Sequence, residues 1–389
     1  MLKEFYHLIS GRRRSMLLSM FLPTFLFGDI FDADAASQRT YRPTQAQRRL
    51  EAQRRLQNQR IAEIRRQNAA RNAAKAAAAA KTAAATKAAE AAPKLRYTWI
   101  KSQRYILLGD IAKFYGLSLV YTKTGAVLRG AAKVDLYYNK RLASIDGVTV
   151  YFTAPPVLRG NNAYLNEKDL LLVLDPVLRG KALAKYPVRT IMIDPGHGGT
   201  DKGAAGAGGR LLEKNLNLSM ALKLRTALRK LGFQVIMTRG ADSTLSLQGR
   251  ADLCRKYKPD LFISVHCNAA AQKTISGIET FAMTPNGCAS SNDSKPGNST
   301  GTGNSFDKNN YRMAYEIQKA LLKNTKAEDR GVKHARFFVL RNASCPAVLI
   351  ETGFISNLRE SALLNRADYQ AKIVNAIVTG ILNYRASYR

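Results

Sequence analysis

The stretch TIMIDPGHGG at residues 190–199 constrains the fold more than any other part of this sequence. An apolar, strand-like run ends there in a glycine-rich turn that presents His197. The chain has four histidines, and two of them, His197 and His266, directly follow short runs rich in β-branched residues. We therefore expect both imidazoles to lie at the ends of β-strands, where binding and catalytic groups gather in α/β folds.

The sequence beyond Tyr186 alternates strand-like and helix-like segments, which predicts an α/β domain over residues 187–389. The expected architecture is a mostly parallel, twisted sheet with helices on both faces. The predicted strands are residues 188–193, 234–238, 261–265, 278–282, 337–340 and 347–350. Apolar residues at helical spacing predict helices at 215–231, 247–257, 311–323 and 369–384. Residues 284–309 have no periodicity, and a loop of that length is usually functional or disordered.

Four side chains are expected to meet at the carboxyl edge of this sheet. His197, His266 and Glu351 each follow a predicted strand, and Glu213 opens the long helix after the glycine-rich loop. Two imidazoles and one carboxylate suit a catalytic zinc ion that keeps a position for water. A second carboxylate must take the water's proton and pass it to the leaving nitrogen, and Glu351 is the candidate. Taken singly, Glu213 also reads as an ordinary helix-opening acid.

These motifs resemble the zinc-dependent N-acetylmuramoyl-L-alanine amidases that cut peptidoglycan. The matching segments, over residues 188–384, are IDPGHGG at 193–199, EKNLN at 213–217, SVHCNA at 264–269, RGVK at 330–333, FVLR at 338–341 and ETGFISN at 351–357. The resemblance implies that His197, Glu213 and His266 are zinc ligands and that Glu351 is the catalytic acid/base. It implies hydrolysis of the amide that joins N-acetylmuramic acid to L-alanine. Asn268, in the same motif as His266, is predicted to contact the substrate.

Three positions depart from this pattern or extend it. Cys267 stands where the family commonly has a small residue, and as the strand neighbour of His266 it is expected to face away from the metal. His334 lies in a basic segment and is expected to be a surface histidine. Some relatives block the site with a regulatory helix, whereas the insertion here, residues 288–305, is rich in Ser, Gly and Asn and suggests a flexible rim.

The N-terminal third has the layout of an export signal followed by a basic linker. Positive residues precede a short apolar run that contains Pro23, and Ala35 and Ala36 follow; this predicts a signal peptide over residues 1–36. Residues 37–94 hold ten Arg and four Lys against three Glu and almost no large apolar residues. They are expected to form a disordered or helical linker, either a plain spacer or a tether to anionic wall polymer or membrane surface.

Residues 95–182 are predicted to form a small α+β module without a catalytic constellation. Helices are expected at 105–115 and 167–174, with strands at 134–138 and 148–152 and a hairpin turn at Asp146-Gly147. Residues 141–178 loosely resemble the copper amine oxidase N-terminal-like modules of exported wall proteins. No copper site follows from that resemblance.

The cysteines and the net charge add two further expectations. Cys254, Cys267, Cys288 and Cys345 allow zero to two disulfides in an exported protein and contain no CxxC metal motif. The net charge of +33 favours polyanionic surroundings. The export signal and the absence of a recognition motif argue against nucleic acid as the partner.

We therefore expect an exported peptidoglycan amidase of the periplasm or cell envelope. The alternatives are a zinc peptidase that cuts stem peptides and an inactive wall-binding protein. The sequence leaves the preferred stem peptide, any activator and the oligomeric state open.

Overall fold

The computed structural model divides the chain into two units, Met1–Ala92 and Pro93–Arg389. It describes residues 44, 45, 52, 55, 59, 62, 63, 66–77, 95–206, 209–293 and 295–387. In the first unit residues 66–77 are helical, as the alanine-rich sequence there favours. The predicted signal peptide lies outside the described residues. Among the residues that are described, no helix has the length and apolar character needed to cross a membrane.

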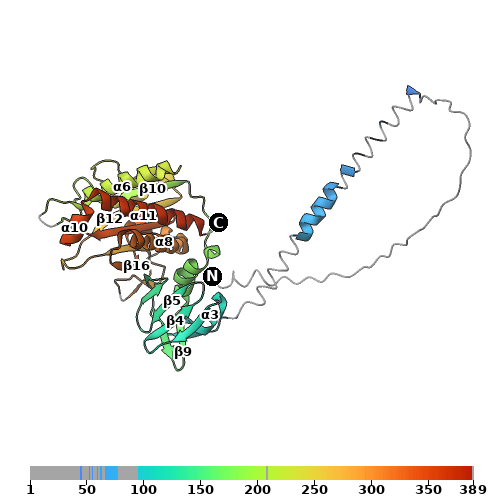
Figure 1. Cartoon of the computed structure of the whole chain (residues 1–389), viewed down its shortest axis with the longest axis horizontal. Coiled ribbons are helices and arrows are strands. Elements are labelled where there is room, and N and C mark those ends of the chain that lie inside the picture. Colours follow the sequence, from blue (N-terminus) through green and yellow to red (C-terminus); the bar gives the residue numbers. More distant parts are fainter. Residues whose placement is uncertain are drawn as a thin grey trace, which may run out of the picture. The chain divides into compact units, whose positions relative to one another are not determined.

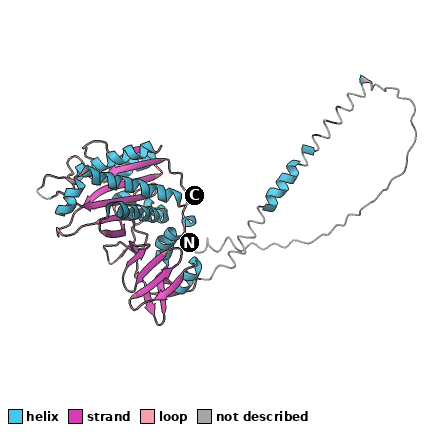
Figure 2. Ribbon diagram, viewed as in Figure 1, coloured by secondary structure: helices cyan, strands magenta, loops and turns pink. Residues whose placement is uncertain are grey.

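The second unit is built on an 11-stranded sheet with the order β11-β10-β12-β17-β13-β16-β7-β6-β5-β4-β3 (Figures 1 and 2). Its first six strands come from the C-terminal half and are parallel to their neighbours, except that β13 and β17 are antiparallel. The bounds are β10 (Thr190–Pro195), β11 (Gln234–Met237), β12 (Leu261–Asn268), β13 (Ile278–Met283), β16 (Asp329–Ala335) and β17 (Ala347–Phe354). The predicted α/β sheet is thus confirmed.

Helices cover both faces of this half of the sheet. Ile191 and Ile193 of β10 pack into a core with three long helices, while Met192 between them faces a second core formed with two shorter helices. This alternation follows from the two-residue period of a strand, and it explains why the strands read as continuous apolar runs. The first group is α6 (Glu213–Lys230), α8 (Asp307–Thr325) and α11 (Ala367–Ala386), and the second is α7 (Leu247–Tyr257) and α9 (Phe338–Arg341). The short helix α10 (Leu358–Leu364) follows β17.

The module of residues 95–182 continues the same sheet. An antiparallel meander runs from β7 out to β3. Its bounds are β3 (Ser118–Tyr121), β4 (Gly125–Arg129), β5 (Lys133–Tyr137), β6 (Leu142–Ile145) and β7 (Val148–Tyr151). Val150 of β7 pairs in parallel with Val332 of β16, and the Thr149 N–H donates to the Asp329 carboxylate at 2.7 Å. The predicted turn at Asp146 and Gly147 is confirmed, since both have positive φ, 48° and 81°.

The module also has a smaller antiparallel sheet with the order β1-β2-β9-β8. Its strands are β1 (Tyr97–Ile100), β2 (Gln103–Leu107), β8 (Val157–Arg159) and β9 (Asn162–Asn166). The helical segments are α3 (Leu108–Tyr115), α4 (Glu167–Asp169), a π-helical turn at Leu170–Leu174, α5 (Asp175–Leu178) and a 3₁₀ turn at Gly180–Ala182. The α+β prediction is therefore confirmed, although the first helix starts three residues late because Tyr105 belongs to β2.

Two predictions were wrong and one strand was missed. Residues 337–340 are not a strand, because Phe338–Arg341 form helix α9 and bury Val339 and Leu340. Strand β16 was missed, since its charged sequence DRGVKHA does not read as a buried strand. His334 within it is only 2% exposed and stacks on Tyr311, so it is a core histidine and not a surface one.

The cysteines form no disulfide in this structure. All four are free and buried. The sulfurs of Cys254 and Cys345 lie 4.0 Å apart, while the thiol of Cys267 contacts the Thr352 hydroxyl at 3.3 Å.

Candidate metal centre

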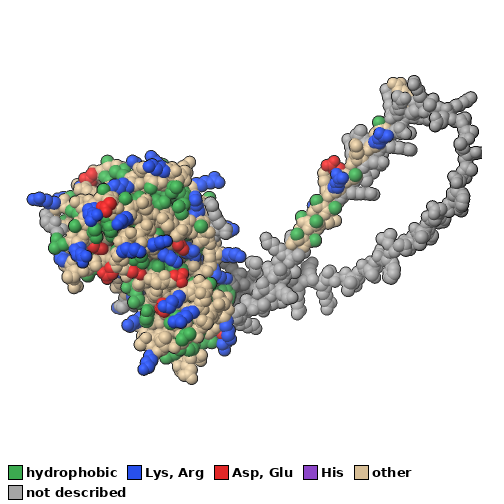
Figure 3. All heavy atoms as spheres, in the orientation of Figure 1, with side chains coloured by type: hydrophobic (Ala, Val, Ile, Leu, Met, Phe, Trp, Pro, Cys, Tyr) green, Lys and Arg blue, Asp and Glu red, His purple; other side chains and the backbone are tan. Residues whose placement is uncertain are grey.

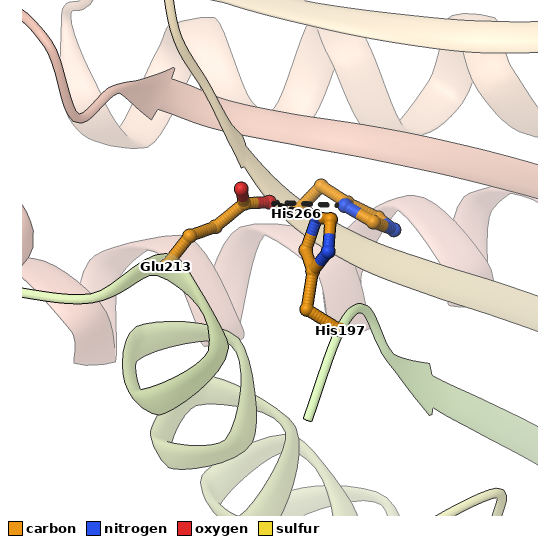
Figure 4. Close-up of side chains that lie close together, drawn as sticks. All are labelled: His197, Glu213 and His266. Carbon is orange, nitrogen blue, oxygen red and sulfur yellow. Dashed lines mark hydrogen bonds and ion pairs between the residues drawn. The ribbon is translucent and has the colours of Figure 1, made fainter. Parts of the chain in front are cut away.

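The structure brings His197, Glu213 and His266 together at the carboxyl edge of the sheet (Figure 4). Glu213 Oε1 lies 3.2 Å from His197 Nε2 and 3.0 Å from His266 Nδ1. One ligand atom from each residue falls within 4.8 Å of the others, and this is the one such group of His, Cys, Asp or Glu among the described residues. Two nitrogens and one carboxylate oxygen at such separations fit a tetrahedral zinc ion with bonds of about 2.0–2.2 Å.

The backbone at the end of β10 is shaped to bring the two imidazoles close. Gly196 has no room for a side chain, because a Cβ atom there would lie 2.0 Å from Cε1 of His266. His197 itself has a φ of 60°, a left-handed conformation that is uncommon outside glycine. The glycine-rich turn therefore changes the direction of the chain and also lets the backbone lie close to the His266 ring.

Two buried arginines and one buried aspartate hold this turn in place. Arg250 of α7 pairs with Asp194 and donates to the carbonyl oxygens of Pro195, at 2.9 Å, and His197, at 2.8 Å. Arg239 donates to the Pro195 carbonyl at 3.0 Å. Charge-assisted bonds of this kind are among the stronger hydrogen bonds in proteins, so the backbone beneath His197 is firmly positioned.

Asp201 orients the ring of His197 from the opposite side. Its carboxylate lies 2.8 Å from His197 Nδ1, which leaves Nε2 directed at Glu213. The hydrogen bond with Glu213 is the largest cause that raises the pKa of His197, and the hydrogen bond and charge of Asp201 raise this pKa further. A carboxylate on the second nitrogen of a ligating histidine is the usual way in which proteins fix ring orientation at a metal.

Glu213 is held at the N-terminus of α6, as expected. The Ala204 N–H donates to its Oε2 at 2.9 Å, and the Asn217 amide donates to its Oε1 at 3.2 Å. Burial alone would raise the pKa of this carboxyl, but the hydrogen bonds from His197 and His266 outweigh burial and lower it. The group is thus ionised, which is the form that binds a cation.

Glu351 lies beside the cluster on the neighbouring strand. His266 of β12 and Glu351 of β17 are direct register partners, and Glu279 of β13 is paired with Glu351 on its other side. Burial raises the pKa of Glu351, and the charges of Glu213 and Glu279 raise it further. Its Oε2 atom is buried and has no hydrogen-bond partner among the described residues.

A cavity of about 510 Å³ opens in front of these side chains. His197, His266 and Glu351 line it on one side, and the rest of its wall is largely apolar, formed by Leu245, Leu247, Phe337, Phe338, Val339 and Leu349 among others. No described residue of the 288–305 insertion lines it. That insertion lies against the module instead, where Arg141 donates to the Ser290 and Ser291 carbonyls.

Asn268 and Cys267 are not among the residues that line this cavity. The Asn268 amide donates to Glu279 at 2.6 Å, and Glu279 also pairs with Lys333. Its substrate contact stays a prediction. The Cys267 thiol is turned away from the cluster towards Thr352, while its backbone N–H donates to Glu213 at 3.2 Å.

Sequence reasoning missed the supporting residues Asp201, Arg239 and Arg250. Asp201 follows His197 by four residues in the glycine-rich loop, and that spacing could have suggested a carboxylate partner for the imidazole. The arginines gave no such signal. They reach the turn from segments more than forty residues away, so only the folded chain reveals their role.

Comparison with known proteins finds relatives of this chain. A family profile described as N-acetylmuramoyl-L-alanine amidase matches residues 191–383. N-acetylmuramoyl-L-alanine amidase LytC of Bacillus subtilis (strain 168) is 37% identical over 292 residues, which are 73% of this chain and 54% of that protein. This chain therefore spans about half the length of that relative.

Two further relatives match over most of their own length. N-acetylmuramoyl-L-alanine amidase AmiA of Escherichia coli (strain K12) is 30% identical over 251 residues, 58% of this chain and 86% of that protein. The solved structure of the CwlD amidase from Clostridioides difficile, in complex with the GerS lipoprotein, is 31% identical with a TM-score of 0.44 and covers 51% of this chain and 98% of that one. With its profile match and an AmiA relative aligned over most of its length, the chain belongs to the N-acetylmuramoyl-L-alanine amidase family.

Proposed function

We propose that this chain hydrolyses the amide bond between the lactyl group of N-acetylmuramic acid and L-alanine in peptidoglycan. The observation that carries the proposal is the cluster of His197, Glu213 and His266 with Glu351 on the adjacent strand, in a member of this amidase family. Zinc is the ion that this donor set suits best, and when bound it supplies Lewis-acid polarisation and a more acidic water.

The chain's own groups would divide the work as follows. His197, Glu213 and His266 hold the ion, and Asp201 keeps the His197 ring in its ligating orientation. Glu351 lines the cavity, and its carboxylate oxygen Oε2 has no hydrogen-bond partner among the described residues, so the carboxylate can accept a proton from the attacking water. The same carboxyl can then donate that proton to the leaving nitrogen of L-alanine.

The cavity wall would handle the uncharged parts of the substrate. Leu247 and Phe337 are exposed apolar residues at this wall, where burial of substrate methyl and acetyl groups would remove apolar surface from water. Such binding would orient the scissile bond through apolar contacts, with Glu351 and the ligand set at the reacting atoms.

Product analysis tests the proposal directly. Purified peptidoglycan treated with the protein should release stem peptides that begin with a free L-alanine amine, as identified by mass spectrometry. Stem peptides cut between amino acids would instead reveal a zinc peptidase. If the folded, metal-loaded protein released no product, the remaining interpretation would be a wall-binding protein without activity.

Metal analysis tests the ligand set separately. The wild-type protein should hold one zinc per chain, whereas His266→Ala should lose both zinc and turnover. The matched control is His334→Ala, which removes a buried imidazole that lies outside the cluster. Full zinc occupancy and normal turnover in His266→Ala would show that the ligands were wrongly assigned.

The location follows from the proposed substrate and from the sequence of residues 1–36. An exported protein of the periplasm or envelope would meet peptidoglycan, and the positive residues, short apolar run and alanine pair suit cleavage near Ala36. N-terminal sequencing of the exported protein should find a start near that residue. An intact Met1 would indicate an uncleaved anchor.

A further inference from the structure

A second groove, of about 460 Å³, lies between the module and the inserted segment, and it shares no lining residue with the cavity at the metal cluster. One wall is formed by β1, β2 and α4, and the other by residues 287–289 and Pro296. Its most prominent side chain is Trp99, the only tryptophan in the sequence, which is 60% exposed.

Two aromatic side chains of β1, Tyr97 and Trp99, are exposed to solvent. Tyr97, two residues earlier on the same strand, is 56% exposed and carries the Arg104 guanidinium 4.7 Å above its ring. Neither aromatic ring belongs to the core clusters, whereas Ile100 at the end of β1 does. Single exposed apolar residues are common, but Trp99 lines a groove together with cationic side chains, where its ring offers a flat stacking surface to a ligand.

The charges around Trp99 define the chemistry of that ligand. The groove is lined by three cationic side chains, Lys101, Arg104 and Lys168, and one carboxylate, Glu167, which Arg104 neutralises. Lys168 is fixed in place by donating to the Asn286 carbonyl at 2.7 Å. A flat aromatic face beside an excess of positive charge suits a sugar ring that carries a carboxylate. Basic side chains recur across the viewed face of this unit (Figure 3).

The proposed reaction makes such a ligand. Hydrolysis breaks the amide C–N bond, leaves the hydroxyl of water on the lactyl carbonyl carbon and passes a proton to the L-alanine nitrogen. Each cut therefore leaves one carboxylate on the glycan and one amine on the released peptide. A glycan strand that has lost its peptides is an uncrowded, regularly anionic sugar chain.

We propose that the groove binds this denuded glycan, with a sugar ring stacked on Trp99 and a lactyl carboxylate paired with Lys101 or Lys168. The identity of the ligand rests on the proposed function. The groove would hold the enzyme on strands that it has already processed, next to neighbouring strands that still carry stem peptides.

The single tryptophan makes the test specific. Tryptophan fluorescence of the full chain, excited selectively over the tyrosines, reports on this groove alone, so no label is needed. Denuded glycan oligosaccharides, prepared with an unrelated amidase, should shift the emission to shorter wavelength and saturate. Neutral N-acetylglucosamine oligomers of equal length should bind at least about tenfold more weakly, and free stem peptide should cause no shift.

Matched variants separate the charge from the ring. Lys101→Gln should weaken the glycan about threefold to tenfold, while Lys123→Gln, an exposed lysine of the same module outside the groove, should not. Trp99→Ala should lower retention on denuded sacculi in a sedimentation assay, and Tyr121→Ala, an exposed aromatic on β3, should leave it unchanged.

Three results would overturn the inference: no emission shift with denuded glycan, an equal shift with the neutral oligomer, or a shift with free stem peptide. Because another enzyme supplies the glycan, these outcomes do not depend on what bond this chain cuts. Failure here together with correct products in the mass spectra would reject the groove and leave the amidase proposal intact.

Discussion

The two halves of the large sheet use strand direction differently. In the C-terminal half, the neighbouring parallel strands β10, β12 and β17 end at one edge and deliver His197, His266 and Glu351 together. In the module, an antiparallel meander alternates its strand ends between two edges, so no such cluster assembles. Its buried Asp169 instead accepts the backbone N–H groups of Thr153 and Ala154, a structural task. Parallel strands thus place their functional side chains at one edge of the sheet, whereas the antiparallel meander leaves the module free to serve as a binding surface.

The largest expected effect comes from Glu351→Gln in the parallel half. The amide keeps the volume of the side chain but cannot move a proton, so turnover should fall about 10² to 10⁴-fold. Zinc content and circular dichroism should stay as in the wild-type protein. Glu316→Gln, a carboxylate of α8 that pairs with Arg312, is the matched control and should keep full activity. Near-normal kcat in Glu351→Gln would move the acid/base role elsewhere.

The next largest effect is expected on stability at acid pH, and it comes from β16, the strand that joins the two halves of the sheet. Burial lowers the pKa of His334 on β16 to about 4, from an ordinary 6.5, and the neighbouring Arg141 and Arg336 lower it further. Between these values the unfolded chain binds a proton that the folded chain does not. The free energy of unfolding therefore has its full value above pH 6.5. It falls as the pH drops towards 4, and His334 accounts for up to ~3 kcal/mol of that loss.

His334→Phe isolates that contribution. The new ring can keep the stacking on Tyr311, which lies 5.0 Å from the imidazole, and it cannot be protonated. Urea unfolding at several pH values should show a smaller loss of stability on acidification than in the wild-type protein. Identical pH slopes for the two proteins would mean that His334 binds its proton equally in the folded and unfolded states.

A smaller effect is expected from Asp201→Asn, which tests whether a loop residue shapes the metal centre. The side chain would still reach His197 but would lose the charge that supports it, so zinc affinity should fall about tenfold to a hundredfold. Competition with a chromophoric chelator measures this affinity. Asp252→Asn, an exposed and ion-paired aspartate of α7, should bind zinc as tightly as the wild-type protein.

The smallest effect on chemistry should come from removing residues 37–94. The fourteen cations of this segment should add salt-sensitive retention on walls, since exposed charges are screened over about 8 Å at physiological ionic strength. A protein that begins at Leu95 should therefore bind sacculi less and with a weaker salt dependence. Both forms should cleave a small soluble muropeptide equally, and a large difference there would tie the segment to the catalytic half.

Sequence reasoning succeeded where local pattern and tertiary role agree. Leu216, Met220, Leu224 and Leu228 recur at helical spacing because they face the core, and helix α6 contains them all. It failed at the FFVL run of residues 337–340, since four apolar residues carry too little periodicity to separate a strand from a helix.

It failed at β16 for a different reason. Lys333 is buried there because Glu279, on another strand, neutralises it. The meeting of His197, Glu213 and His266 could be foreseen because each of them lies in a local motif. The network of Arg239, Arg250 and Asp194 that supports the cluster is assembled from distant segments and has no local signature.

The pairing of β7 with β16 also has a consequence for orientation. A module on a flexible tether would sample many angles relative to the catalytic edge, whereas strands of one sheet share a fixed direction. A denuded strand held at Trp99, on the smaller sheet of the module, would then lie at one constant offset from the cavity. The module would in that sense act as a ruler between the processed strand that it holds and the neighbouring strand that is cut.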